Sequence, residues 1–454
     1  MSQEQDNTAL LNEGPVFKAV CSIMVPMAIM MTANVAFSYL DAWYISRLGS
    51  DALNAMDVSF PLINLCSAVL YGGLGTGVSV AVARKYAVKD HERSETCLKT
   101  GIVLALPLSL IFTLGVIFGK GLLFGEAKNL TSRNMAYDYC YWYFMFIFIM
   151  AIGAVASSSM RGAGYARKPA IYSLICMVLN AILTPIFAFD SLNLGYIQME
   201  FGLNLGIKGA AVSTVIVYTI FTLLLIKDLF AGSQGFKLTS FKWTPDKEIL
   251  RNIFKASSIA ALLPLVTNLV IILLLKVMSL KSDVLVDAFS LAKRFELYII
   301  QLTVCLGAGT MVVMGASHAT ENTERVKEVL FTSFKILFFV ATPVTVFMIF
   351  FSDLYYSSLT NSEAIISEGQ KYFLYGSLNM LFTSAIILMN FSFQGIGRPS
   401  RPIPFSLFSV IVIQGIAGFF LIDGDYNTSI YYGLTSIGTT ITFGFIVRRF
   451  LKTI

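Results

Sequence analysis

The feature that most constrains this chain is a series of long apolar segments that contain no charged residue. Clear examples are Trp142–Met160, Ala170–Phe189, Ala256–Leu275, Tyr372–Gly397 and Tyr426–Val447. A helix needs about 20 apolar residues to cross a bilayer, and it satisfies its own backbone hydrogen bonds there. A transmembrane barrel would instead show alternating segments of about ten residues. The runs therefore predict transmembrane helices.

Composition agrees with a membrane protein. Hydrophobic residues make up 56% of the 454 and charged residues 13%, and the mean hydropathy is +0.72. Soluble domains carry about 25% charged residues. We expect an all-α integral membrane protein with no sizeable soluble domain. Residues 1–15 are expected to form a polar cytoplasmic tail, and no cleavable signal peptide is visible.

The apolar runs predict about 12 transmembrane helices. They are expected at 16–46, 54–83, 98–119, 137–159, 169–189, 206–226, 252–280, 284–316, 330–352, 372–394, 402–422 and 427–447.

The distribution of Lys and Arg predicts the orientation. With a cytoplasmic N-terminus, 23 of the 33 basic residues fall in cytoplasmic segments and 8 in external ones, while Lys293 and Arg294 lie within a helix. The positive-inside rule then predicts that both termini are cytoplasmic, in the cell (inner) membrane. The net charge of +6 fits contact with anionic lipid headgroups and does not call for nucleic acid.

Two sequence echoes indicate an internal duplication. The segment Gly-Leu-Gly-Thr-Gly at 73–77 returns as Cys-Leu-Gly-Ala-Gly at 305–309, and Arg-Gly-Ala-Gly at 161–164 returns as Gln-Gly-Ile-Gly at 394–397. Since six helices separate the copies, the two halves should run parallel.

The duplication sets the expected domains. They are an N-lobe over 16–230, a cytoplasmic linker over 231–251 and a C-lobe over 252–454, with a central cavity between the lobes. Two related parallel lobes are typical of transporters that bind a small molecule near the midplane. Channels usually gain symmetry by oligomerising, and we expect this chain to function as a monomer without a cofactor.

The chain is not expected to be an enzyme. No Walker A sequence is present, so ATP hydrolysis is excluded as its energy source. An ion gradient, or the gradient of the substrate itself, must supply the energy. This directs attention to ionisable residues inside the membrane.

Asp41 is the clearest ionisable candidate in the first half. It follows an apolar stretch from Val20 to Leu40 and precedes Trp43 and Tyr44, which resemble an interfacial belt. Pro26 would let this helix bend. The alternative reading of Asp41 is an aspartate at the outer surface that caps the helix end.

Asn180 and Thr184 are further candidates. They lie at i and i+4 in an apolar run, so they share one helix face and present two oxygen ligands in the same direction. Hydrogen bonding between helices explains the same residues equally well.

In the second half, Lys293, Arg294, Glu296 and Gln301 form a polar cluster in one helix. Pairing of Glu296 with Lys293 or Arg294 would reduce the cost of burying the charges. The cluster is interpreted either as a patch facing the central cavity or as a structural ion pair.

Several motifs together resemble those of the multidrug and toxic compound extrusion (MATE) family. They are Pro26…Asn34…Asp41, Phe60-Pro61…Gly72-Gly73-Leu74-Gly75-Thr76-Gly77, Arg161-Gly162-Ala163-Gly164, Asn180, Gly206–Thr214, Lys293-Arg294-Phe295-Glu296 and Gln394-Gly395-Ile396-Gly397. The resemblance spans about 16–450 and is closer to the DinF-like branch, which keeps an aspartate in its first helix.

The resemblance implies an antiporter that exports amphipathic, often cationic drugs or metabolites in exchange for H⁺ or Na⁺ as two lobes rock. Asp41 would be the coupling carboxylate, with Asn180, Ser213 and Thr214 as partners. Thr184 stands where the family often has a second aspartate. Na⁺ bound by Asp41 and Asn180 is the alternative to H⁺, and the missing carboxylate favours H⁺; no other metal site is expected.

Two other function classes remain open from the sequence. A flippase for lipid-linked saccharides belongs to the same superfamily, although such proteins typically have fourteen helices and strongly basic cavities. A channel or a membrane scaffold would not need the duplicated halves or the ionisable groups inside the membrane. The exported compound is not identified by the sequence.

Overall fold

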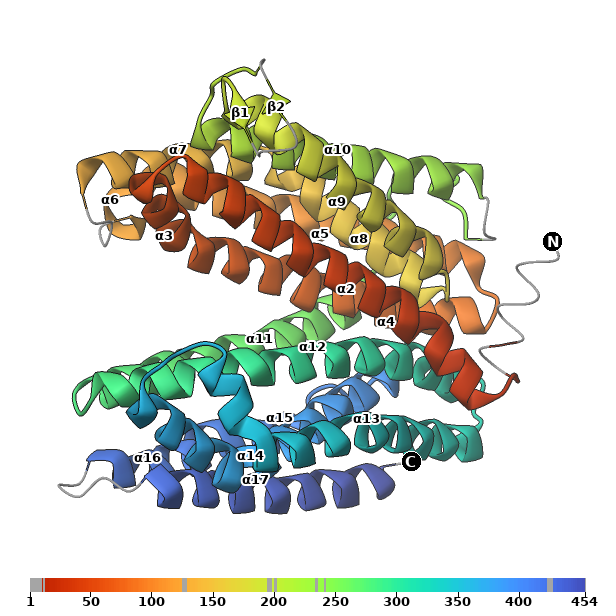
Figure 1. Ribbon diagram of the computed structural model, residues 1–454. Helices are drawn as coiled ribbons and strands as arrows, with labels where there is room; N and C mark the ends of the chain where they lie inside the picture. Colours follow the sequence, from red (N-terminus) through yellow and green to blue (C-terminus); the bar gives the residue numbers. More distant parts are fainter. Residues whose placement is uncertain are drawn as a thin grey trace. The chain divides into compact units, whose positions relative to one another are not determined.

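The computed structural model of the protein describes residues 10, 13–124, 129–193, 198–199, 202–232, 236–240, 242–422 and 428–453. Most of these residues lie in helices (Figure 1). The exception within these ranges is a short antiparallel pair, β1 (Leu192–Asn193) and β2 (Gln198–Met199). The expected all-α class is confirmed apart from this two-residue ladder.

Within the described residues, ten helices are long and apolar enough to cross a membrane. They are α2 (Val16–Arg47), the continuous run α3 (Ser50–Ser67), η1 (Ala68–Gly75) and α4 (Thr76–Ala87), α5 (His91–Phe118), α9 (Arg167–Ala188), α10 (Ile207–Ala231), α11 (Lys247–Ser279), α12 (Asp283–Ala319), α13 (Thr323–Ser357), α14 (Glu363–Gly395) and α17 (Thr428–Leu451). The chain is therefore a multi-pass membrane protein.

The two remaining expected helices are interrupted. The expected helix over 137–159 consists of α7 (Leu130–Met145) and α8 (Ile147–Gly162), bent by 52° where Phe146 leaves the helical conformation. The expected helix over 402–422 consists of α15 (Ile403–Leu407), the π-helical turn η2 (Phe408–Ile413) and α16 (Gln414–Ile422). A single turn also forms α6 (Lys120–Leu123).

Contacts divide the chain into two compact units. The first comprises 25–261, and the second comprises 9–24 together with 262–454. The first part of α2 therefore packs with the second unit, and the first part of α11 packs with the first unit. Each of these helices changes unit close to a proline, Pro26 in α2 and Pro264 in α11.

Each unit has its own apolar core. In the first unit, α9 and α10 run side by side, and α10 also contacts α7 and α8 (Figure 1). Leu98, Phe144 and Phe221 belong to that core. In the second unit, α14 contacts α12, α13 and α17, around core residues that include Phe289 and Phe373.

The duplicated glycine motif makes the same contact in both units. A β-carbon on Gly162 would collide with the backbone carbonyl of Ser79, and one on Gly395 would lie 2.9 Å from the carbonyl oxygen of Met311. Small residues let two helices approach this closely. The echo detected in the sequence is thus a repeated helix–helix contact.

The segment between the two halves is docked rather than extended. Glu95 of α5 accepts hydrogen bonds from the backbone N–H of Thr239 (2.8 Å) and from its hydroxyl, and it pairs with Lys99 (2.9 Å). Phe236 and Leu238 are buried beside this anchor. The described part of the linker is therefore fixed to the first unit.

Candidate functional site

Asp41 lies inside the first unit. Its side chain is only 3% exposed, and α2 continues beyond it to Arg47. The hydroxyl of Tyr44, one turn later, donates a hydrogen bond to the backbone carbonyl of Ala181 (2.9 Å) and so fixes this part of α2 against α9. The position does not match an aspartate that caps a helix end at the surface.

Two hydroxyl groups contact the Asp41 carboxyl group, and a third contacts one of these two. Thr184 Oγ1 of α9 lies 3.3 Å from Asp41 Oδ1, and Thr214 Oγ1 of α10 lies 3.4 Å from Asp41 Oδ2. Ser213 Oγ joins the cluster at 2.9 Å from Thr184 Oγ1. The structure therefore brings together four of the residues singled out in the sequence, from three different helices.

The hydroxyl groups of this cluster have few protons left to donate to Asp41. The hydroxyls of Ser213 and Thr214 both lie 2.9 Å from the backbone carbonyl of Ala210, closer than Thr214 lies to Asp41. A hydroxyl has one proton to donate and two lone pairs. If the Thr214 proton goes to Ala210, Thr214 Oγ1 faces Asp41 as an acceptor, and Thr184 is left as the hydroxyl that donates to Asp41 Oδ1. Such surroundings suit a carboxyl group that carries a proton or holds a cation.

Asn180 supplies a second polar group to this face. It lies one helical turn before Thr184 on the same side of α9, it is fully buried, and neither its Oδ1 nor its Nδ2 has a hydrogen-bond partner among the described residues. An unsatisfied buried amide costs about 1–3 kcal/mol. Among the described residues, Asn180 therefore does not form the interhelical hydrogen bond that the sequence also allowed, whereas Thr184 forms such bonds with Asp41 and Ser213.

Asp41 has no basic partner among the described residues. The ion pairs found there involve other carboxylates, such as Glu95 with Lys99 and Glu296 with Lys293. The same part of the chain contains no group of three His, Cys, Asp or Glu side chains that could hold a metal ion. Asp41 therefore lies among neutral oxygens.

The second unit contains a buried charged cluster. Glu296 of α12 is 2% exposed, and its Oε2 accepts hydrogen bonds from Lys293 Nζ and from the hydroxyl of Tyr372 on α14, both at 2.6 Å. The Lys293 ammonium also lies over the rings of Phe289 (5.4 Å) and Tyr372 (5.9 Å). The expected pairing of Glu296 with a basic residue is realised by Lys293.

Arg294 and Gln301 do not belong to this cluster. Arg294 is exposed and forms no ion pair with Glu296, because consecutive helical residues point in directions about 100° apart. Gln301 is half-buried further along α12 and makes no hydrogen bond to Lys293 or Glu296. Pro26 lies within α2, which continues through it without a break.

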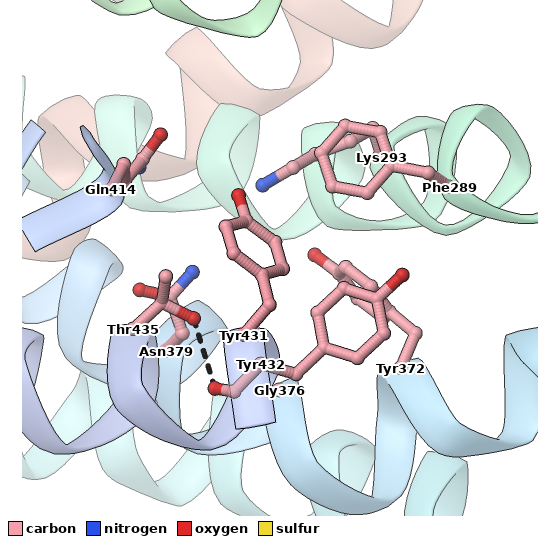
Figure 2. A pocket seen from close by; sticks show the side chains of 9 residues that line it. All are labelled: Phe289, Lys293, Tyr372, Gly376, Asn379, Gln414, Tyr431, Tyr432 and Thr435. Atoms are coloured by element: carbon pink, nitrogen blue, oxygen red, sulfur yellow. Dashed lines mark hydrogen bonds between the residues drawn. The ribbon is translucent and has the colours of Figure 1, made fainter. Parts of the chain in front are cut away.

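The sequence did not single out the aromatic residues beside Lys293. Figure 2 shows a pocket in the second unit lined by Phe289, Lys293, Tyr372, Gly376, Asn379, Gln414, Tyr431, Tyr432 and Thr435. The available signals were the adjacent tyrosines 431 and 432 and one asparagine in an apolar helix. Among the chain's 20 Tyr and 37 Phe these signals are not distinctive.

A duplicated, multi-pass helical protein with a buried ionisable group in each unit has the architecture of a transporter. The chain belongs to the MatE family, whose model matches residues 26–186 and 258–420. The resemblance inferred from the motifs is thereby confirmed. Members of this family are membrane transporters and not enzymes.

Individual relatives agree with this assignment. The FAD transporter of Shewanella oneidensis is 22% identical over 395 residues, covering 85% of this chain and 84% of its own. The multidrug export protein MepA of Staphylococcus haemolyticus is 26% identical over 274 residues, 58% of this chain and 56% of its own.

Solved structures share the fold. A MOP superfamily transporter from Pyrococcus furiosus superposes with a TM-score of 0.85 at 22% identity, covering 98% of this chain and 97% of its own. The outward-facing structure of a multidrug resistance MATE family transporter gives the same TM-score at 23% identity, again covering 98% and 97%.

Proposed function

We propose that the protein is a proton-coupled antiporter that exports amphipathic, often cationic drugs or metabolites by alternating access. The observation that carries the proposal is Asp41, a buried carboxyl group that contacts the hydroxyls of Thr184 and Thr214 and, among the described residues, forms no ion pair with a basic side chain. A lone carboxylate is costly inside a membrane. It therefore binds a proton or a cation, and releasing that ion can be linked to binding a substrate.

Two features favour H⁺ over Na⁺ as the coupling ion. A Na⁺ site would have one carboxylate, since Thr184 supplies a hydroxyl rather than a second negative charge. The contacts of Asp41 with Thr184 and Thr214, at 3.3 and 3.4 Å, leave the carboxyl group loosely held and open to protonation. Asn180 would then contact the substrate or the exchanging ion through its unpartnered amide.

The relatives support the substrate class. One is named as a multidrug export protein and another as an FAD transporter, so drugs and larger metabolites are both candidates. We further propose an orientation with both termini in the cytoplasm of a bacterial cell, in the inner membrane, and a functional monomer.

The test is transport of ethidium, a flat amphipathic cation, into proteoliposomes under an imposed pH gradient or an imposed Na⁺ gradient. Wild-type protein should respond to the pH gradient, and Asp41→Asn should abolish that response while the protein still inserts and purifies normally. Glu296→Gln, tested in parallel, should retain coupling. Transport that ignores both gradients would contradict antiport and would favour a flippase of the same superfamily.

A further inference from the structure

The pocket of Figure 2 lies wholly in the second unit, and none of its lining residues comes from α2, α9 or α10. Its walls come from α12, α14, α16 and α17. We propose that this pocket binds a single oxyanion group, a carboxylate or a phosphate, through the ammonium of Lys293. This inference is independent of the coupling ion and of the transport direction proposed above.

The charge of the residues that line the pocket determines the sign of the charge that the ligand should carry. Lys293 is the single charged residue among the nine that line the pocket, and the others are aromatic, amide, hydroxyl or glycine residues. Glu296, which pairs with Lys293, does not line it. The side chain of Lys293 is 22% exposed and that of Glu296 only 3%. A ligand that enters the pocket therefore meets the ammonium, with the carboxylate behind it.

The ammonium is held in place but keeps bonding capacity. Its contact with Glu296 Oε2 at 2.6 Å uses one of three N–H groups. The ammonium also forms cation–π interactions with the rings of Phe289 and Tyr372. Because the position of Lys293 is fixed before a ligand arrives, little side-chain entropy is lost when its other N–H groups bind an anion.

Neutral donors lie around the same space. Figure 2 shows the Lys293 ammonium and the Tyr431 hydroxyl directed toward the same part of the pocket, while Asn379 and Gln414 line another part of its wall. Tyr431 is 3% exposed and donates no hydrogen bond to another described residue. Charge-assisted hydrogen bonds from an ammonium, supported by hydroxyl and amide donors, are the usual means of binding carboxylates and phosphates.

The size of the pocket restricts the ligand to one group. The space enclosed by its walls is about 10 Å³, room for about one water-sized group, so the rest of any ligand would lie in the open mouth. Sites for drug-sized molecules are far larger. A complete drug molecule does not fit. The ligand is therefore either a small free anion or the anionic end of a larger molecule.

A cation would meet two obstacles in this pocket. It would lie beside the Lys293 ammonium, where like charges repel, or it would have to displace that ammonium from Glu296. Displacement would expose a buried carboxylate without its partner, which is costly. The geometry therefore favours anions over cations here.

The first experiment measures the thermal stability of the purified full-length protein in detergent with sodium phosphate, sodium acetate or sodium chloride at equal ionic strength. A ligand that binds only the folded state raises the midpoint by an amount that grows with the logarithm of its concentration above its dissociation constant. Phosphate or acetate should raise the midpoint of wild type by several degrees over chloride. Lys293→Arg should keep that shift.

Removing the charge should remove the shift. Since Lys293→Met alone leaves Glu296 unpaired, the decisive variant is Lys293→Met with Glu296→Gln, which deletes both charges together. A variant that keeps the full oxyanion shift overturns the proposal, and so does a wild type that responds equally to all three salts.

A matched pair of dyes identifies the source of the anion. Rhodamine 110 carries a free carboxylate, and rhodamine 123 is its methyl ester. If the anion is one end of a larger molecule, fluorescence anisotropy should show wild type binding rhodamine 110 about tenfold more tightly, and the double variant should lose this preference. Competition by millimolar phosphate without such a preference would assign the pocket to a free anion. Tighter binding of rhodamine 123 after the double substitution would instead mark a cation site and contradict the proposal.

Discussion

Gly77 and Gly309 hold equivalent places in the two units, each pressed against the start of a helix that enters from the other half of the chain. A β-carbon on Gly77 would lie 2.9 Å from the backbone carbonyl oxygen of Ile253 in α11, and one on Gly309 would lie 2.8 Å from that of Val20 in α2. Ile253 follows Val20 by 233 positions, nearly the spacing of the two glycines. In each unit, the duplicated glycine motif therefore forms the surface against which a helix from the other half of the chain packs.

Substituting these glycines should destabilise the protein. Gly77→Ala and Gly309→Ala each place a methyl group against a backbone carbonyl that cannot move without shifting a helix, and overpacking of this kind costs about 1–3 kcal/mol. The measurement is the thermal unfolding midpoint in detergent. Gly433→Ala is the matched control, because a β-carbon there meets nothing within 4 Å. Equal midpoints for the glycine variants and the control would show that Gly77 and Gly309 are not needed for close packing of these helices.

Substituting Asn180 should change stability and transport in opposite directions. Its amide is buried without partners, so Asn180→Leu should raise the unfolding free energy by about 1 kcal/mol, while ethidium transport in proteoliposomes should fall sharply. A purely structural asparagine predicts the opposite pattern, with a lower unfolding midpoint and normal transport. Both quantities are measured on the same purified preparation.

If Asp41 is the coupling carboxylate, the residue at position 184 should set how much negative charge a coupling cation meets. Thr184→Asp would place a second carboxylate about one hydrogen-bond length from Asp41, since the threonine hydroxyl already lies 3.3 Å from Asp41 Oδ1. Two adjacent carboxylates repel unless a cation or a proton lies between them. We expect this variant to gain a response to a Na⁺ gradient at fixed pH, with choline replacing Na⁺ in the control. A variant with no Na⁺ response would show that carboxylate number does not select the ion.

Glu95 anchors the linker between the two halves. The negative charge of Glu95 attracts Lys99 and strengthens the hydrogen bonds that Thr239 donates. Glu95→Gln removes this charge and should weaken both contacts. Trypsin should then cleave several-fold faster at Lys237 and Lys242, which are exposed. Glu92→Gln, which changes an exposed glutamate on the same helix, should cleave at the wild-type rate. Identical rates for both variants would show that the anchor does not hold the linker.

Much of the fold could be read from the sequence because hydrophobic thickness fixes helix length. The interruptions could not. Nothing local in Phe146 marks the bend between α7 and α8, and the helices α13 and α14 begin well before their expected starts, in polar segments. Hydropathy detects only the apolar part of a helix, so polar turns at its ends are missed.

The residues around Asp41 could be predicted from the sequence better than those around Lys293. Asp41, Thr184, Ser213 and Thr214 could be selected because polar residues in apolar runs are few, and the structure places them together. For Glu296 the choice between Lys293 and Arg294 required the helix geometry. Tyr372 and Tyr431 could not be found from sequence, because aromatic residues in a membrane protein mostly face lipid or other helices.

If Asp41 carries the proton that is exchanged for substrate, binding of substrate should release that proton into solution. Ethidium is added to purified protein in weakly buffered detergent solution near pH 7, and the pH change is recorded with a soluble indicator. Wild type should release protons on binding, at most about one for each ethidium bound if a single carboxyl group is linked to the site. Asp41→Asn should bind ethidium without releasing protons. Equal release by both proteins would contradict the account.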